Sequence, residues 1–243
     1  MKILLTNDDG IDSESLIKFA EKLNEICDLT VYAPSGECSG MSHSLSLHKT
    51  IKVEEEKRAY KSFRVYGTPV DCVKMGVTQS IDKYDLVVSG VNKGTNLATD
   101  VWYSGTVQAA YEGAVAGIPA IAVSTKKKAV TGLDTAIEFF LNNFQNLFEI
   151  ARKTAVLSIN VPDLELKDIK GVVFAPLGRT LYNDSYGKKE ENMYEHISTL
   201  TPYAANREEC DIFAFKTGNI VLTPLSLDCT DYAFLKKQED FRI

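Results

Sequence analysis

Residues 2–10 read KILLTNDDG, a short apolar run that leads directly into two adjacent carboxylates and a glycine. Lys2–Thr6 has the length and the aliphatic content of a buried β-strand. If this strand belongs to a parallel sheet, Asp8 and Asp9 follow its carboxyl end, where ligands bind in open α/β sheets. Neighbouring carboxylates repel each other unless a cation or a proton lies between them. The stretch therefore favours an α/β fold with a hard divalent cation at the sheet edge. The alternative is a turn in which these side chains cap the next helix.

Strand-like and helix-like segments alternate through the first two-thirds of the chain. Further strands are expected at residues 29–33, 86–89, 120–124 and 155–160. Helices are expected after Ser13 and at residues 69–77, 105–116 and 131–150. Residues 50–53 and 62–66 fit a β-hairpin. This alternation is typical of a doubly wound, parallel sheet with helices on both faces.

The pattern changes near residue 163. Short strand-like pieces occur at residues 171–175, 195–200 and 220–223, and residues 180–191 are expected to form an exposed arm. The tail at 228–241 fits a helix. We treat the chain as a single domain, with a core of about residues 1–162 and a β-rich extension of about 163–243. Apolar side chains in the extension have no place on a finished parallel sheet, so the extension is expected to mediate oligomerisation.

The amino-acid composition of the chain limits the kinds of molecule that it is expected to bind. The 27 Lys and Arg residues are outnumbered by 33 Asp and Glu residues, and this balance disfavours a long nucleic acid as partner. No stretch approaches the roughly 18 apolar residues of a membrane span, and the N-terminal apolar run is too short for a signal peptide. The five scattered cysteines contain no CxxC motif and fit reduced thiols. A cytoplasmic protein without a membrane partner is expected.

Polar, glycine-rich loops follow several of the expected strands. They lie at residues 7–10, 34–44 and 89–96, and a fourth, at 103–106, precedes a helix whose free N–H groups suit an anion. These loops can converge on one edge of a parallel sheet. They would bring together carboxylates, a hydroxyl, amide oxygens, an imidazole and a lysine. Hard oxygen ligands suit Mg²⁺ or Mn²⁺, and the whole set is what metal-assisted phosphoester hydrolysis requires.

The order and spacing of these motifs resemble the SurE family of 5′-nucleotidases, the stationary-phase survival proteins. The similarity covers nearly the whole chain. It is carried by LLTNDDGI at 4–11, SG and HS within 39–44, GTP at 67–69, VSGVNKGTN at 88–96, YSGTV at 103–107, and Gly218 with TPL at 223–225.

The resemblance implies a Rossmann-like, three-layer αβα core and hydrolysis of nucleoside monophosphates. It also implies homodimers or homotetramers built with exchanged C-terminal segments. It implies one divalent metal per subunit, held by Asp8, Asp9, Ser39 and Asn92. The phosphate side is implied to consist of Asn96, Ser104, Gly105 and Thr106.

Within this interpretation a metal-activated water is the nucleophile, and Asp8 or Asp9 orients or deprotonates it. His43 is a candidate proton donor to the leaving ribose oxygen, and its alternative is a loop histidine bonded to backbone. An aspartyl-phosphate mechanism is disfavoured because it needs two carboxylates spaced one residue apart. A nucleotide-binding regulatory module without turnover stays open, because a Rossmann-like fold does not fix function. A broader phosphatase acting on 3′-nucleotides or polyphosphate also stays open.

Overall fold

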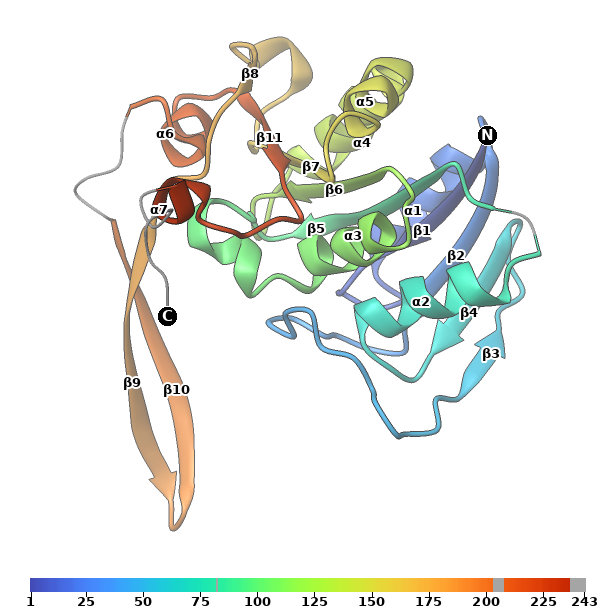
Figure 1. The fold of residues 1–243 in the computed structure, drawn as a ribbon, viewed down its shortest axis with the longest axis horizontal. Coiled ribbons are helices and arrows are strands. Elements are labelled where there is room, and N and C mark those ends of the chain that lie inside the picture. Colours follow the sequence, from blue (N-terminus) through green and yellow to red (C-terminus); the bar gives the residue numbers. More distant parts are fainter. Residues whose placement is uncertain (82, 203–207, 237–243) are drawn as a thin grey trace.

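A single mixed sheet forms the centre of the computed structural model, which describes residues 1–81, 83–202 and 208–236 (Figure 1). Its strand order is β3-β4-β2-β1-β5-β6-β7-β11-β8. All pairs from β4 to β7 in this order are parallel. The strands are β1 (Lys2–Thr6), β2 (Asp28–Pro34), β3 (Val53–Glu55), β4 (Lys61–Val65), β5 (Leu86–Lys93), β6 (Ala120–Thr125), β7 (Val156–Val161), β8 (Val172–Phe174) and β11 (Ile220–Leu225).

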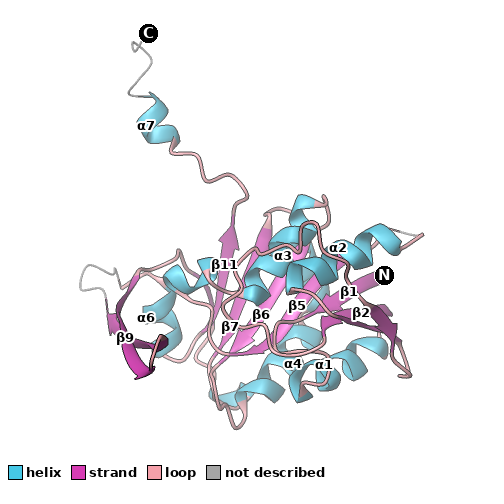
Figure 2. Ribbon diagram, turned by 90° about the horizontal axis from the view of Figure 1, so that it is seen from below, coloured by secondary structure: helices cyan, strands magenta, loops and turns pink. Residues whose placement is uncertain are grey.

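Helices cover both faces of this sheet, as Figure 2 shows. Helices α1 (Glu14–Asn24), α4 (Gly132–Asn142) and α5 (Phe144–Ala151) pack on one face. Helices α2 (Pro69–Gln79) and α3 (Gly105–Val115) pack on the other. Successive residues of a strand point to opposite faces, so Leu5 joins the first core and Leu4 the second. The predicted three-layer αβα fold with a mainly parallel sheet is confirmed.

Several element boundaries differ from the sequence-based expectation, among them the first hairpin strand, which was expected at 50–53 and lies at 53–55. Two of the differences have a visible local cause. The long helix expected at 131–150 is divided at Asn143, whose backbone leaves the helical region and whose Nδ2 donates to the Phe139 carbonyl at 2.9 Å. Strand β5 continues to Lys93, beyond the expected end at Ser89. An irregularity in its pairing with β6, between Ser89 and Asn92, allows this continuation.

The C-terminal part completes the central sheet and also leaves it. Strand β11 pairs antiparallel with β7, and β8 pairs parallel with β11. Strands β9 (Thr180–Glu190) and β10 (Met193–Pro202) form a separate antiparallel ribbon, here called the arm, which projects from the body (Figure 1). The expected exposed arm is therefore present, although its first strand was not predicted.

Short helices complete the described chain. The 3₁₀ turns η1 (Ala98–Trp102) and η2 (Leu166–Asp168) and helix α6 (Asp211–Lys216) were not predicted. Helix α7 (Tyr232–Lys236) stands away from the body in Figure 2 and begins later than the tail helix expected at 228–241, because residues 228–231 are not helical. Residues 237–241 of that prediction lie outside the described residues. All five cysteines are free thiols. In the described ranges no helix is long and apolar enough to cross a membrane.

Candidate active site

An open cleft of about 1110 Å³ lies where the predicted loops meet. Its floor and one wall come from the ends of β1 and β5, the loop after β2, and the start of α3. The arm and the β6–α4 loop also contribute side chains. The lining residues from the body are Asp8, Asp9, Glu37, Ser39, Gly40, Asn92, Lys93, Gly94, Thr95, Asn96, Asp100, Tyr103, Ser104, Lys127 and Lys128. The convergence expected from a parallel sheet is thus observed.

Asp8 is fixed against the first turn of α3. Its Oδ2 accepts a hydrogen bond from the Thr106 backbone N–H at 3.1 Å, and its Oδ1 accepts one from the Thr106 hydroxyl. The residue is only 3% exposed. Burial removes hydration from the carboxylate and raises the pKa of Asp8 to about 6, and the charge of Asp9 adds to this shift. Asp8 is therefore a buried acid beside a second acid.

A glycine makes this contact between β1 and α3 possible. A Cβ atom at Gly105 would lie 2.9 Å from the Asp8 Cβ and 3.2 Å from the Cys38 carbonyl oxygen. The Cys38 N–H in turn donates to the Asp8 carbonyl at 2.7 Å. Close approach of the helix to the carboxylate therefore requires the absence of a side chain at Gly105.

The other predicted metal ligands border the same cleft. Asp9 Oδ2 accepts from the Lys93 backbone N–H at 3.3 Å, and burial together with the charge of Glu37 raises the pKa of Asp9. The Asn92 side-chain amide donates to the Gly94 carbonyl at 2.8 Å. The Ser39 hydroxyl donates to Glu37 at 2.9 Å. The structure thus brings all four predicted ligands to one cavity.

The charges of the cleft fit a bound cation. Five carboxylates line it, against three lysines, of which Lys93 also pairs with Glu14 at 3.0 Å. An anionic phosphate ester would meet net repulsion here without a positive ion. Among the described residues no cluster of three or more His, Cys, Asp or Glu side chains suits a metal. The predicted set contains two carboxylates, a hydroxyl and an amide, which are the oxygen donors that Mg²⁺ and Mn²⁺ prefer.

The predicted phosphate-side residues divide into two groups. Ser104 and Asn96 line the cleft. The Ser104 Oγ caps α3 by accepting from the Val107 N–H at 3.0 Å, and the Asn96 Nδ2 donates to the Ser124 hydroxyl at 2.8 Å. Gly105 and Thr106 lie behind Asp8 instead. Because the Thr106 N–H already donates to Asp8, its role is to fix the carboxylate.

His43 is placed differently from the prediction. One ring nitrogen lies 3.0 Å from Gln108 Oε1 and the other 2.9 Å from Glu112 Oε2, both on α3. Glu112 also accepts from Lys74 at 2.6 Å. His43 does not border the cleft. The geometry therefore does not support His43 as a proton donor, because its ring ties its own loop to Gln108 and Glu112 of α3.

Sequence reasoning missed several residues of the cleft. Lys127 and Lys128 follow the carboxyl end of β6, and the run of three lysines at 126–128 was a usable signal. The arm contributes Tyr182, Asp184, His196 and Ser198. No local pattern marks these residues, because only the folding of the arm brings them to the cleft.

Comparison with known proteins identifies the family of this chain. The family model described as Survival protein SurE matches residues 3–184. The chain belongs to the SurE family. The 5′-nucleotidase SurE of Clostridium beijerinckii is 37% identical over 97% of this chain and 96% of its own length. That of Thermoanaerobacter sp. is 39% identical, over 96% and 94%.

A solved structure of the SurE family gives the same result for the fold. The crystal structure of the SurE protein from Aquifex aeolicus superposes with a TM-score of 0.81 at 31% identity, covering 98% of both chains. The resemblance predicted from the motifs is confirmed, and so is the fold class.

Proposed function

We propose that this chain is a divalent-metal-dependent phosphomonoesterase that hydrolyses nucleoside 5′-monophosphates to nucleoside and phosphate. The observation that carries the proposal is the meeting of Asp8 and Asp9 with Ser104 at the start of α3 in one cleft. Membership of the SurE family supports it, because relatives from Clostridium beijerinckii and Thermoanaerobacter are named 5′-nucleotidases.

In this proposal Asp8, Asp9, Ser39 and Asn92 would hold one Mg²⁺ or Mn²⁺ ion. When bound, such an ion offsets the charge of the carboxylates and polarises phosphoryl oxygens and water. The chain contributes rigidity, because Asp8 is fixed by Thr106 and Asp9 by the Lys93 backbone. Preorganised charges lose little energy to rearrangement when the reaction proceeds.

Side chains of the cleft would bind the phosphate group and activate the attacking water. The Ser104 hydroxyl would bind phosphoryl oxygens, and Lys127 and Lys128 would add positive charge. Asp9, whose pKa burial raises, would orient the attacking water and accept its proton. In this scheme water forms the new bond to phosphorus as the bond from phosphorus to the ribose 5′ oxygen breaks. The phosphoryl group is thus transferred in a single displacement, and the departing 5′ oxygen takes a proton from solvent.

Phosphate release from a substrate panel tests the proposal. The purified full chain is incubated with 5′-AMP, 3′-AMP and short polyphosphate, with Mn²⁺ or with EDTA. We expect 5′-AMP to be cleaved at least about tenfold faster than the other two, a difference in transition-state stabilisation of about 1.4 kcal/mol. EDTA should abolish activity. Binding of 5′-AMP without release would identify a regulatory module, and equal rates on all three substrates would identify a broader phosphatase.

We also propose that the partner of this chain is a second copy of itself, in a homodimer or homotetramer. Helix α7 exposes Tyr232, Phe234 and Leu235, which are 65%, 57% and 51% exposed. This short helix has no apolar partner among the described residues of the body, and Figure 2 shows it standing apart. Exchange of C-terminal segments between subunits would bury these side chains.

A further inference from the structure

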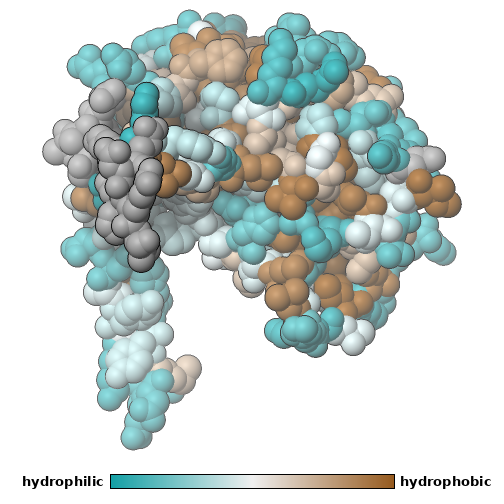
Figure 3. All heavy atoms as spheres, viewed as in Figure 1, coloured by the Kyte–Doolittle hydropathy of each residue, from teal (hydrophilic) through white to brown (hydrophobic). Residues whose placement is uncertain are grey.

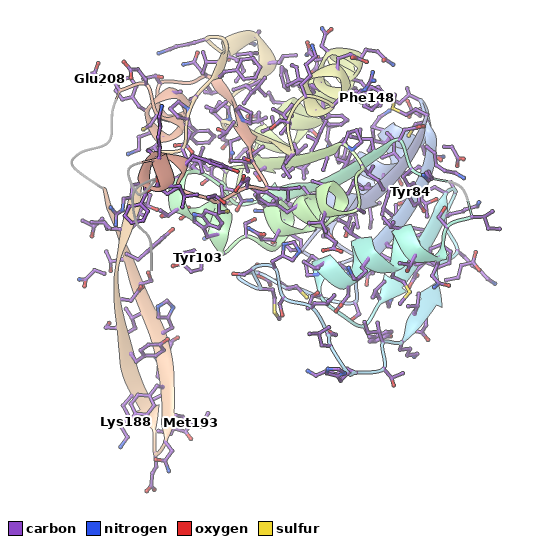
Figure 4. All side chains as sticks on the ribbon, viewed as in Figure 1. Tyr84, Tyr103, Phe148, Lys188, Met193 and Glu208 are labelled. Carbon is purple, nitrogen blue, oxygen red and sulfur yellow. The ribbon has the colours of Figure 1, made fainter. Side chains whose placement is uncertain are left out.

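One side of the arm forms a wall of the cleft. Tyr182 and Asp184 of β9 and His196 and Ser198 of β10 line the same cavity as Asp8 and Asp9. The strand register places Asp184 opposite Ser198. Residues two apart on a strand share a face, so these four side chains project from one side of the ribbon. Lys188 and Met193 mark the distal tip of the arm in Figure 4, far from its attachment to the body.

The base of this wall is bonded to the segment that begins α3. The Tyr182 hydroxyl donates to Asp100 Oδ1, and the Thr99 hydroxyl donates to the Thr180 carbonyl at 3.1 Å. Asp100 and Thr99 belong to η1, which leads directly to Ser104. The wall is therefore held in a defined position relative to the phosphate end of the cleft.

The wall offers hydrogen-bonding groups that phosphate hydrolysis does not use. His196 Nε2 lies 3.1 Å from Asp184 Oδ1, and the two side chains are 52% and 50% exposed. The Tyr186 ring contacts the imidazole, with 5.2 Å between ring centroids. A carboxylate, an imidazole and a hydroxyl are suited to the hydroxyls of a ribose and the polar edge of a base.

An aromatic ring stands opposite this polar wall. Tyr103 is 61% exposed, and Figure 4 shows it in the space between the body and the arm. Aromatic side chains bind nucleobases by stacking. The face of the arm that is visible in Figure 3 is mostly polar. At about 1110 Å³ the cleft has room for much more than a phosphate group.

We propose that Tyr103 together with the cleft-facing side of the arm (Tyr182, Asp184, His196 and Ser198) is the nucleoside subsite. The Asp184–His196 pair binds polar groups of the nucleoside, and Tyr103 provides the stacking surface for the base. This inference rests on the proposed function and deepens it, because it assigns the part of the molecule that selects a nucleotide over other phosphate esters.

A comparison of two substrates tests the subsite. kcat/KM is measured with Mn²⁺ for 5′-AMP and for p-nitrophenyl phosphate, whose reactive leaving group needs no nucleoside contacts. The Asp184→Ala/His196→Ala double variant of the full chain should lose at least about tenfold in kcat/KM for 5′-AMP, mainly through KM. Its kcat/KM for p-nitrophenyl phosphate should change less than about twofold. Glu195→Gln is the matched control, because Glu195 is an exposed residue of β10 that pairs with Lys189 at 2.6 Å outside the cleft.

Equal losses on both substrates, or an unchanged kcat/KM for 5′-AMP, would overturn the subsite while the wild-type rate on 5′-AMP still supports the proposed function. If the wild type releases no phosphate from 5′-AMP, the proposed function fails. Equilibrium dialysis of the wild type and the double variant with labelled 5′-AMP then tests the nucleoside subsite by itself. Weaker binding by the double variant than by wild type would support the subsite. Equal binding, or no binding by the wild type, would overturn it.

Discussion

Asp8 combines burial, a neighbouring acid and two hydrogen bonds from Thr106 in a single side chain. Burial raises the pKa of its carboxyl from 3.8 to about 6 in the folded chain. Well below pH 4 the group is neutral in both the folded and the unfolded chain. Between about pH 4 and pH 6 the unfolded chain is ionised while the folded chain still holds the proton, so the free energy of unfolding falls across this window and levels off above it. A shift of this size corresponds to about 3 kcal/mol.

We predict that removing the charge of Asp8 stabilises the metal-free protein, because the folded chain then no longer holds an ionised carboxylate in a buried position. In EDTA, Asp8→Asn should be more stable than the wild type at pH 8 by up to about 3 kcal/mol, and the difference should shrink to less than about 1 kcal/mol at pH 4. Urea unfolding at the two pH values measures the difference. Asp12→Asn is the control with the opposite sign, because a hydrogen bond from Arg64 lowers the pKa of Asp12. A stability difference for Asp8→Asn that is the same at both pH values would contradict this explanation.

At the scale of elements, periodicity predicted the strands and helices of the core, because buried strands and amphipathic helices repeat with different periods. Local sequence patterns did not predict the break at Asn143, where the Asn143 side chain donates a hydrogen bond to the Phe139 carbonyl and the helix expected at 131–150 is divided in two. They also missed the first strand of the arm. Its residues are mostly exposed and polar, so they carry no burial signal.

Removal of helix α7 should change the oligomeric state. A chain ending at Ser226 lacks the exposed apolar residues of α7 and should form monomers or aggregates, whereas we expect the full chain to form dimers or tetramers. Light scattering on both proteins at equal concentration measures this. An oligomer of unchanged size after truncation would show that the C-terminal segment does not join the subunits.

At the scale of the whole molecule, parallel topology made the site partly predictable. Carboxyl ends of parallel strands meet at one edge, so the loops at 7–10, 34–44 and 89–96 could be assigned to one cavity before their geometry was known. The family resemblance then selected Asp8, Asp9, Ser39 and Asn92 within these loops. The location of His43 could not be predicted. Its partners on α3 lie 65 and 69 residues further along the chain, and only tertiary packing brings them together. The same holds for the arm, whose contacts with η1 span about eighty residues.

Mn²⁺ binding by the wild type and by Asp9→Asn tests the central claim most directly, because the claim requires a divalent cation at the carboxylate pair. Isothermal titration calorimetry should give one Mn²⁺ per wild-type chain. Asp9→Asn should keep the circular dichroism spectrum but bind Mn²⁺ at least about tenfold more weakly. Asp134→Asn, which alters an exposed carboxylate of α4 paired with Lys18, should bind as the wild type does. Mn²⁺ affinity in Asp9→Asn equal to that of the wild type would contradict the account.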